Sequence, residues 1–213
     1  FIAALVILAT VSANAGLTYT FDAITSNDPS GTAATIAETQ LTMDVTTLSP
    51  GLVSFVFENT GSYVSSVSEI YFDSPDLIPP LSLTLATIIN GPGVLYVEEE
   101  NPTPLPGGND PLIQFVADVV AEAGPPPSKR GINPGEWLEL QLTYTDPPHN
   151  FIDMLHSGQL RVGLHVIGMG VNGTGGTYSE SFINDIVIPE PSTAMLLGFV
   201  ALVGRSYRKI FLV

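Results

Sequence analysis

The stretch Glu136–Thr145 alternates apolar and polar side chains from Leu138 to its end. Leu138, Leu140 and Leu142 share one side, and the residues between them are polar or charged. A period of two places successive side chains on opposite faces of a β-strand, and it does not match the turn of a helix. This segment is therefore expected to be a strand with one face in a hydrophobic core, which requires a surrounding sheet.

The same alternation recurs along the chain between turns rich in Gly, Pro, Asn and Ser. It predicts strands at Leu17–Ala23, Thr39–Leu48, Leu52–Asn59, Val67–Asp73, two within Leu77–Val97, Leu112–Ala123, Glu136–Thr145, Leu160–Ile167 and Tyr178–Ile188. Loops are expected at Thr25–Thr35, Asn101–Pro111, Gly124–Gly135 and Gly168–Thr177, and one or two helical turns at Pro147–His156. Because Leu112–Ala123 also contains good helix formers, a helix is the alternative there.

Nine or ten short strands with one short helix predict an all-β fold. We expect a single antiparallel two-sheet sandwich of jelly-roll-like size spanning residues 16–186. The 213-residue chain contains no cysteine, so no disulfide supports this fold and its core must be hydrophobic. Between residues 16 and 188 there are only three cations, Lys129, Arg130 and Arg161, against twenty acidic side chains. Such a surface repels nucleic acid and anionic lipid.

The first fifteen residues have the pattern of a secretory signal peptide. An apolar run from Phe1 to Val11 precedes Ala13-Asn14-Ala15, where Ala13 and Ala15 form a small-x-small cleavage site. We expect a signal helix over residues 1–15 that is removed after Ala15. No positively charged n-region precedes Phe1, so we expect the natural chain to begin further upstream.

The last part of the chain, residues 187–213, combines three features in order. Pro189, Glu190 and Pro191 form a stiff turn, an apolar run follows from Ala194 to Val203, and Arg205, Arg208 and Lys209 form a basic end. The two prolines remove backbone donors and fix an extended backbone around the glutamate. The following apolar residues favour a helix, whose basic end would stay on the cytoplasmic side of a membrane.

This order resembles the PEP-CTERM sorting signal of Gram-negative bacteria, which membrane-embedded exosortases recognise and cleave. The resemblance covers Val187 to about Lys209 and implies that Pro189, Glu190 and Pro191 are recognition residues. The basic group is interrupted as RSYRK, and four apolar residues follow it where the family's signal usually stops. The run GQLRVGLHVIGMG also resembles uncharacterised proteins with this signal, and it implies no activity.

A permanent membrane anchor is the alternative for this tail. The apolar run has ten residues, which makes about 15 Å of helix against a hydrocarbon core of roughly 30 Å. A longer span would place three cations inside the bilayer. A cleaved signal with transient inner-membrane insertion therefore explains the tail better.

Two sets of residues have the character of metal ligands. His149, Asp153 and His156 would share one face of a short helix, where two imidazoles and a carboxylate suit a transition metal. Calcium would suit the acidic loops, with Asp73 and Asp76 in one, Asn109 and Asp110 in another, and Glu98–Glu100 in a third. None of these loops completes a calcium-binding pattern, and solvated turns or a solvated helix face are the simpler interpretation. No cofactor other than calcium is indicated.

Other chemistry has weaker support in the sequence. Trp137, Tyr63 and Tyr178 would suit a sugar-stacking platform, although Trp137 would also serve as a rim residue covering the sheet. Glu136 and Glu139 face opposite sides of a strand, so they do not form a carboxylate dyad by themselves. The chain lacks a Gly-x-Ser-x-Gly elbow and a cysteine nucleophile, and its glycine run lacks the lysine of a phosphate loop.

These observations predict a non-catalytic protein with a structural or adhesive sandwich. It would be exported by its leader, which signal peptidase removes, held briefly in the inner membrane and cut by an exosortase. It would then be delivered to the cell surface or to an extracellular polysaccharide matrix. The alternative is a carbohydrate- or calcium-binding module on the same fold. An extracellular hydrolase is a third hypothesis, for which the sequence offers no motif.

Overall fold

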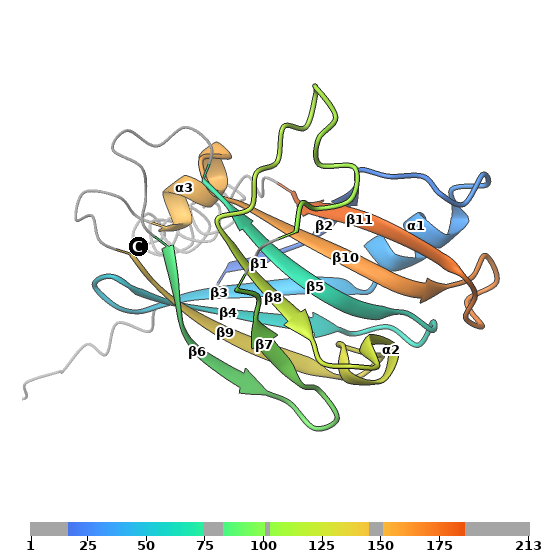
Figure 1. Ribbon diagram of the computed structural model, residues 1–213, viewed down its shortest axis with the longest axis horizontal. Coiled ribbons are helices and arrows are strands. Elements are labelled where there is room, and N and C mark those ends of the chain that lie inside the picture. Colours follow the sequence, from blue (N-terminus) through green and yellow to red (C-terminus); the bar gives the residue numbers. More distant parts are fainter. Residues whose placement is uncertain (1–16, 75–82, 101–102, 145–150, 186–213) are drawn as a thin grey trace, which may run out of the picture.

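The computed structural model describes residues 17–74, 83–100, 103–144 and 151–185 of the chain (Figure 1). In this part the chain forms eleven strands and three short helices. They are β1 (Leu17–Tyr19), β2 (Phe21–Ala23), α1 (Thr32–Glu38), β3 (Leu41–Ser49), β4 (Leu52–Asn59), β5 (Ser66–Asp73), β6 (Leu83–Asn90), β7 (Tyr96–Glu98), β8 (Val119–Ala123), α2 (Pro127–Arg130), β9 (Trp137–Tyr144), α3 (Phe151–Ser157), β10 (Arg161–Met169) and β11 (Tyr178–Asn184).

The strands form two antiparallel sheets that pack face to face (Figure 1). The five-stranded sheet has the order β1-β3-β4-β9-β6, and the six-stranded sheet has the order β2-β11-β10-β5-β8-β7. One continuous hydrophobic cluster fills the space between them and includes the inward side chains of both sheets. The expected all-β, two-sheet sandwich is therefore confirmed.

Strands of the five-stranded sheet follow the predicted alternation closely. In β9, Leu138, Leu140 and Leu142 are fully buried, while Glu139 and Gln141 lie on the outer face and remain partly exposed. The hairpin of β3 and β4 is also confirmed, and its alternate apolar side chains enter the same core.

The first expected strand, Leu17–Ala23, is divided between the two sheets. β1 pairs with β3 and β2 pairs with β11, so the chain crosses the sandwich at Thr20. Tyr19 and Phe21 are both almost fully buried on either side of this crossing. The crossing keeps both aromatic rings in one core. Because residues 19 and 21 would also share one face of a single strand, the alternation of apolar residues does not reveal the crossing.

Three other segments differ from the prediction. The segment expected as a loop at Thr25–Thr35 contains the start of α1, because the buried Asp28 carboxylate accepts the backbone N–H of Ala33 at 3.0 Å and holds the helix entrance. The loop expected at Gly124–Gly135 contains α2. The strand expected over Leu112–Ala123 begins only at Val119, and the residues before it belong to a long projecting loop.

β6 does not keep one alternation along its length. A β-bulge between Leu85 and Thr87 shifts the register, so that Ile88 rather than Thr87 packs against the core. An extra residue in a strand reverses the faces of all that follow.

The two helices expected at the termini, the expected signal cleavage site at Ala13 and Ala15, and the Pro189-Glu190-Pro191 motif lie outside the described residues. Within the described ranges, no helix combines the length and the hydropathy needed to cross a bilayer.

Candidate functional site

Part of the outer face of the six-stranded sheet is covered by a loop, residues 103–118, that rises from the sandwich (Figure 1). Leu105 and Phe115 of this loop are buried against Tyr71 of β5 and Val120 of β8 in a second hydrophobic cluster. Gly163 of β10 makes this contact possible, since a Cβ there would lie 2.8 Å from Leu105 and 3.1 Å from Phe115. The loop is therefore seated on the sheet by apolar packing.

Arg161 of β10 fastens the same loop by polar contacts. Its guanidinium pairs with the buried Asp73 carboxylate and donates to the backbone carbonyls of Ile113 and Gln114, both at 2.6 Å. The guanidinium also lies over the Phe115 ring, 5.2 Å from its centre. Burial raises the pKa of Asp73 although Arg161 acts in the opposite direction. One cation thus links two strands of the sheet to the loop.

The loop is closed at its base and ordered within. Asp118 accepts hydrogen bonds from the backbone N–H and the hydroxyl of Ser74, at 2.8 and 2.6 Å. The Phe115 N–H donates to the carbonyl of Gly108 at 2.8 Å, so the two sides of the loop are hydrogen-bonded to each other. The outer end of the loop is therefore held in one position relative to the sheet.

This fixed loop exposes large apolar side chains. Leu112 is 92% exposed and Val116 is 70% exposed, the two highest values among the large hydrophobic residues of the described part. A cleft of about 670 Å³ lies between the loop and the Asp73–Arg161 pair, and an apolar cleft of about 410 Å³ lies on the Phe115 side of the loop. Apolar side chains on a rigid projection are typical of a contact surface.

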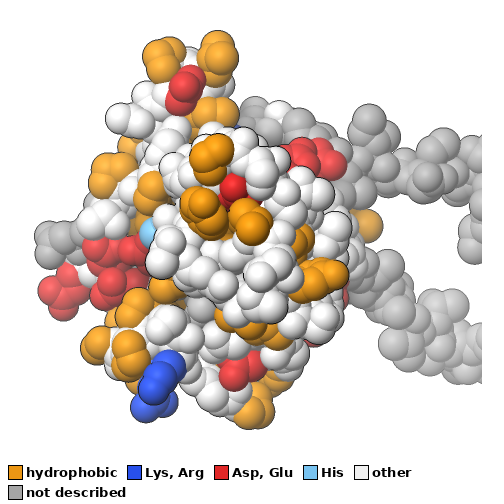
Figure 2. All heavy atoms as spheres, turned by 90° about the vertical axis from the view of Figure 1, so that its right-hand side faces the viewer, with side chains coloured by type: hydrophobic (Ala, Val, Ile, Leu, Met, Phe, Trp, Pro, Cys, Tyr) orange, Lys and Arg blue, Asp and Glu red, His pale blue; other side chains and the backbone are white. Residues whose placement is uncertain are grey.

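A pair of titratable residues lies on the same face, beside the loop. His165 Nδ1 lies 2.8 Å from Glu69 Oε2, and the Tyr71 hydroxyl donates to the same oxygen at 2.8 Å. The hydrogen bond from His165 lowers the pKa of Glu69. Glu122 of β8 pairs directly opposite Glu69, and a cleft of about 190 Å³ opens in front of the group. Figure 2 shows acidic side chains gathered beside a histidine on one side of the molecule.

The geometry around His165 does not form a nucleophilic relay. Ser68 donates its hydroxyl proton to the backbone carbonyl of His165 at 3.0 Å, and its oxygen approaches the same ring nitrogen that contacts Glu69. A serine–histidine–acid relay needs the serine and the carboxylate on opposite ring nitrogens. This arrangement therefore anchors the imidazole on the sheet.

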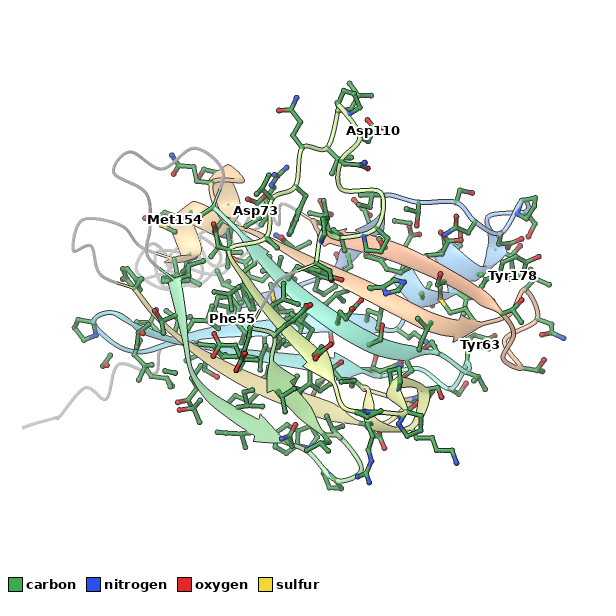
Figure 3. All side chains as sticks on the ribbon, in the orientation of Figure 1. Phe55, Tyr63, Asp73, Asp110, Met154 and Tyr178 are labelled. Atoms are coloured by element: carbon green, nitrogen blue, oxygen red, sulfur yellow. The ribbon has the colours of Figure 1, made fainter. Side chains whose placement is uncertain are left out.

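The residues that the sequence indicates as calcium ligands are separated in the structure. Asp73 is engaged by Arg161 at the base of the loop, whereas Asp110 lies towards its outer end and accepts the N–H of Leu112 at 2.8 Å (Figure 3). Asn109 lines the apolar cleft, and Asp76 lies outside the described residues. Glu99 accepts the N–H of Thr103 at 3.4 Å.

Of the possible transition-metal ligands His149, Asp153 and His156, the structure describes only the last two. Asp153 is exposed on α3, His156 packs its ring 5.9 Å from that of Tyr19, and His149 lies outside the described residues. Across the described ranges, no three His, Asp or Glu side chains converge closely enough to hold a metal ion.

The three candidate sugar-stacking aromatics do not form one platform. Tyr63 and Tyr178 lie at the same end of the sandwich (Figure 3), and Tyr63 is 46% exposed with its ring against Gly173 of the glycine-rich loop. Trp137 instead covers the backbone of Gly91, as expected for a rim residue.

Glu136 and Glu139 are each engaged by their own neighbours. Glu136 accepts hydrogen bonds from Asn133, and Glu139 accepts them from Ser54 and Gln141. The glycine run packs backbone against backbone, since a Cβ on Gly170 would lie 2.5 Å from a carbonyl oxygen within the same loop.

Sequence reasoning missed the loop site, although the strand expected at Leu160–Ile167 has Arg161, Gly163 and His165 at alternate positions, and so on one face. The missed signal is the glycine on that face. A glycine inside a strand often marks a site where another segment approaches closely. Gly163 therefore indicates that another part of the chain covers the strand.

The chain matches no protein-family model, no curated protein and no solved structure.

Proposed function

We propose that this chain is an exported, non-catalytic surface or extracellular-matrix protein, whose sandwich presents loop 103–118 as a fixed adhesive contact. Its export would use a signal helix at residues 1–15, and its release from the inner membrane would use the PEP-CTERM-like tail at residues 187–213. Exosortase and signal peptidase are its partners during export. Extracellular polysaccharide or a protein embedded in it is the partner afterwards.

The observation that carries the adhesive part is the contrast within the loop. Arg161 and Phe115 fix the base, while Leu112 and Val116 remain exposed above it. A contact element that is already ordered loses little conformational entropy on binding.

The adhesive part is tested by substituting the exposed apolar residues. The double variant Leu112→Ser, Val116→Ser should lower retention of the protein on host cells and matrix by about tenfold or more. Each substitution removes apolar surface area from the contact. Leu48→Ser is the matched control, because Leu48 is also an exposed leucine, 47% accessible, at the end of β3. Equal retention of the loop variant and the control would reject the loop as the contact.

The sorting part is tested separately at the tail. Glu190→Ala should leave unprocessed precursor in the inner membrane, measurable as a higher mass of the membrane-bound protein. A Glu190→Ala protein that is matured and released as usual would reject recognition through this motif. Wild-type surface protein that still contains Leu202 and Arg208 would instead support a permanent anchor.

A carbohydrate-binding role is a second candidate, favoured by the exposed ring of Tyr63 beside the glycine-rich loop. Sugar rings stack on such exposed aromatic faces. Tyr63→Ala should weaken binding to the isolated matrix polysaccharide in this case, and it should leave binding unchanged if loop 103–118 is the contact.

A further inference from the structure

The sandwich ends in four edge strands that differ in length. Three of them, β1, β2 and β7, have three residues each, and the fourth, β6, has eight. Among the described strands, β6 pairs only with β9. Its other side therefore presents backbone N–H and C=O groups that can pair with an added strand.

The sequence of β6 lacks most of the usual protection of an edge. The strand reads LTLATIIN, with no charged residue and no proline. Lysine, proline, short length and β-bulges are the common devices that prevent edge-to-edge pairing, and β6 has only the last of these. The bulge at Ala86 bends the first half of the strand, and it leaves Thr87–Asn90 in regular register with β9.

The inward side chains of β6 are incompletely buried. Leu83, Leu85 and Ile88 pack against the main core but remain partly exposed, whereas the leucines of the neighbouring β9 have no exposed surface. Further apolar side chains are exposed along this side of the sandwich, where β6 and β7 run (Figure 1): Ile89 at 37%, Leu95 at 41% and Val97 at 46%. An added strand would complete this part of the core.

We propose that β6 is a homodimer interface, in which two copies pair antiparallel and join their five-stranded sheets into one continuous sheet. The uncharged sequence of β6 suits a second copy of the same strand as the occupant. Carboxylates stand on β3, β4, β5 and β9, and the whole chain has a net charge of −15. Like charges opposite each other on paired strands are destabilising, and β6 against itself brings none together. Such a symmetric contact closes at two copies.

The expected affinity is modest. One strand pair with a few apolar neighbours covers less than the roughly 1,600 Å² of a standard interface, so we expect a Kd of about 10 µM. Two copies of this strongly acidic protein repel each other, although the paired β6 strands themselves carry no charge. Raising the salt concentration from about 50 to 500 mM should therefore strengthen the dimer.

Sedimentation velocity of the full chain at several concentrations tests this interface. Thr87→Lys introduces a charge on the exposed edge and should raise the Kd at least tenfold. Thr18→Lys is the matched control, because Thr18 is also an exposed threonine, on β1 at the opposite edge of the same sheet. Both variants have the same termini, so association through the chain ends would leave them alike. Equal association of the two variants, or a wild-type monomer at every concentration, would overturn the proposal.

Disulfide trapping gives an independent readout, since the chain has no cysteine of its own. In an antiparallel pair centred on Thr87–Asn90, a cysteine at position 87 or 89 lies close to its own copy. Thr87→Cys or Ile89→Cys should then form a covalent dimer at least ten times faster than Thr18→Cys. No preference over position 18 at either site would also overturn the proposal.

Discussion

The outer faces of the two sheets are built in opposite ways. On the five-stranded sheet no described loop covers the outer face, and its exposed side chains make short local contacts such as Thr18 with Asp44 at 2.5 Å. On the six-stranded sheet loop 103–118 covers part of the outer face, and Tyr71 and Val120 are fully buried beneath it. The same sandwich therefore has one face whose stability is local and one whose stability depends on a distant loop.

This difference shows where side-chain changes should matter. A substitution on the open face, that of the five-stranded sheet, replaces a solvent-exposed contact with another solvent-exposed contact. A substitution under the loop removes a contact that holds the loop on the sheet. Removing a buried aromatic ring, or one partner of a buried ion pair, costs several kcal/mol, and removing an exposed polar pair costs about 1 kcal/mol or less.

The largest effect is expected for Phe115→Ala. This ring is 3% exposed, packs edge-on against Tyr71 and lies beneath Arg161. Its removal should lower the free energy of unfolding by about 3 kcal/mol, measured by urea denaturation. Val56→Ala, on the open face, is the comparison and should cost about 0.5 kcal/mol. Similar costs for both would remove the distinction between the faces.

Arg161→Ala is expected to come next, at about 2–3 kcal/mol, because it leaves the Asp73 carboxylate buried without its partner while Arg161 itself is partly exposed. Arg161→Lys should recover less than half of the loss, since an ammonium keeps the charge but not the two-carbonyl fork or the ring contact. Full recovery with lysine would show that charge alone holds the loop.

A smaller, pH-dependent effect is expected at Glu69. The hydrogen bond from His165 lowers the pKa of this carboxyl below 4.5. A lowered folded-state pKa stabilises the protein fully above the unfolded pKa, and this stabilisation disappears as the pH falls through the folded value. Stability measured from pH 6 to pH 3, about the range of carboxyl titration, should therefore fall less for Glu69→Gln than for the wild type. Parallel profiles would contradict the pairing.

The smallest effect is expected for Asp44→Ala on the open face. Its exposed contact with Thr18 predicts a change within about 0.5 kcal/mol in the same denaturation experiment. A loss above 1 kcal/mol would mean that the open face is held by more than local contacts.

The sequence predicted the open sheet better than the covered one, for a physical reason. Strands such as β9 have one buried and one solvated face, which gives the clean alternation of Leu138 to Leu142. β5 is buried on both faces for most of its length, so its residues do not alternate in burial. The covering loop has no periodicity, and only its partners on β10 mark its place.

The candidate site was likewise only half visible in the sequence. Acidic and aromatic residues attracted attention because of their chemistry, but Asp73 and Trp137 prove to hold Arg161 and to cover Gly91. Leu112 and Val116 carry no motif, and their exposure follows from the fold of a loop that sequence periodicity cannot describe.

The central claim, that loop 103–118 is a fixed projection held by Arg161, is tested most directly by amide hydrogen exchange. The Phe115 amide, bonded to the Gly108 carbonyl, should be protected in the wild type and should exchange about a hundredfold faster in Arg161→Ala. Amides of β3 on the open sheet should keep their rates. A Phe115 amide that exchanges freely in the wild type, or at the same protected rate in Arg161→Ala, would contradict the account.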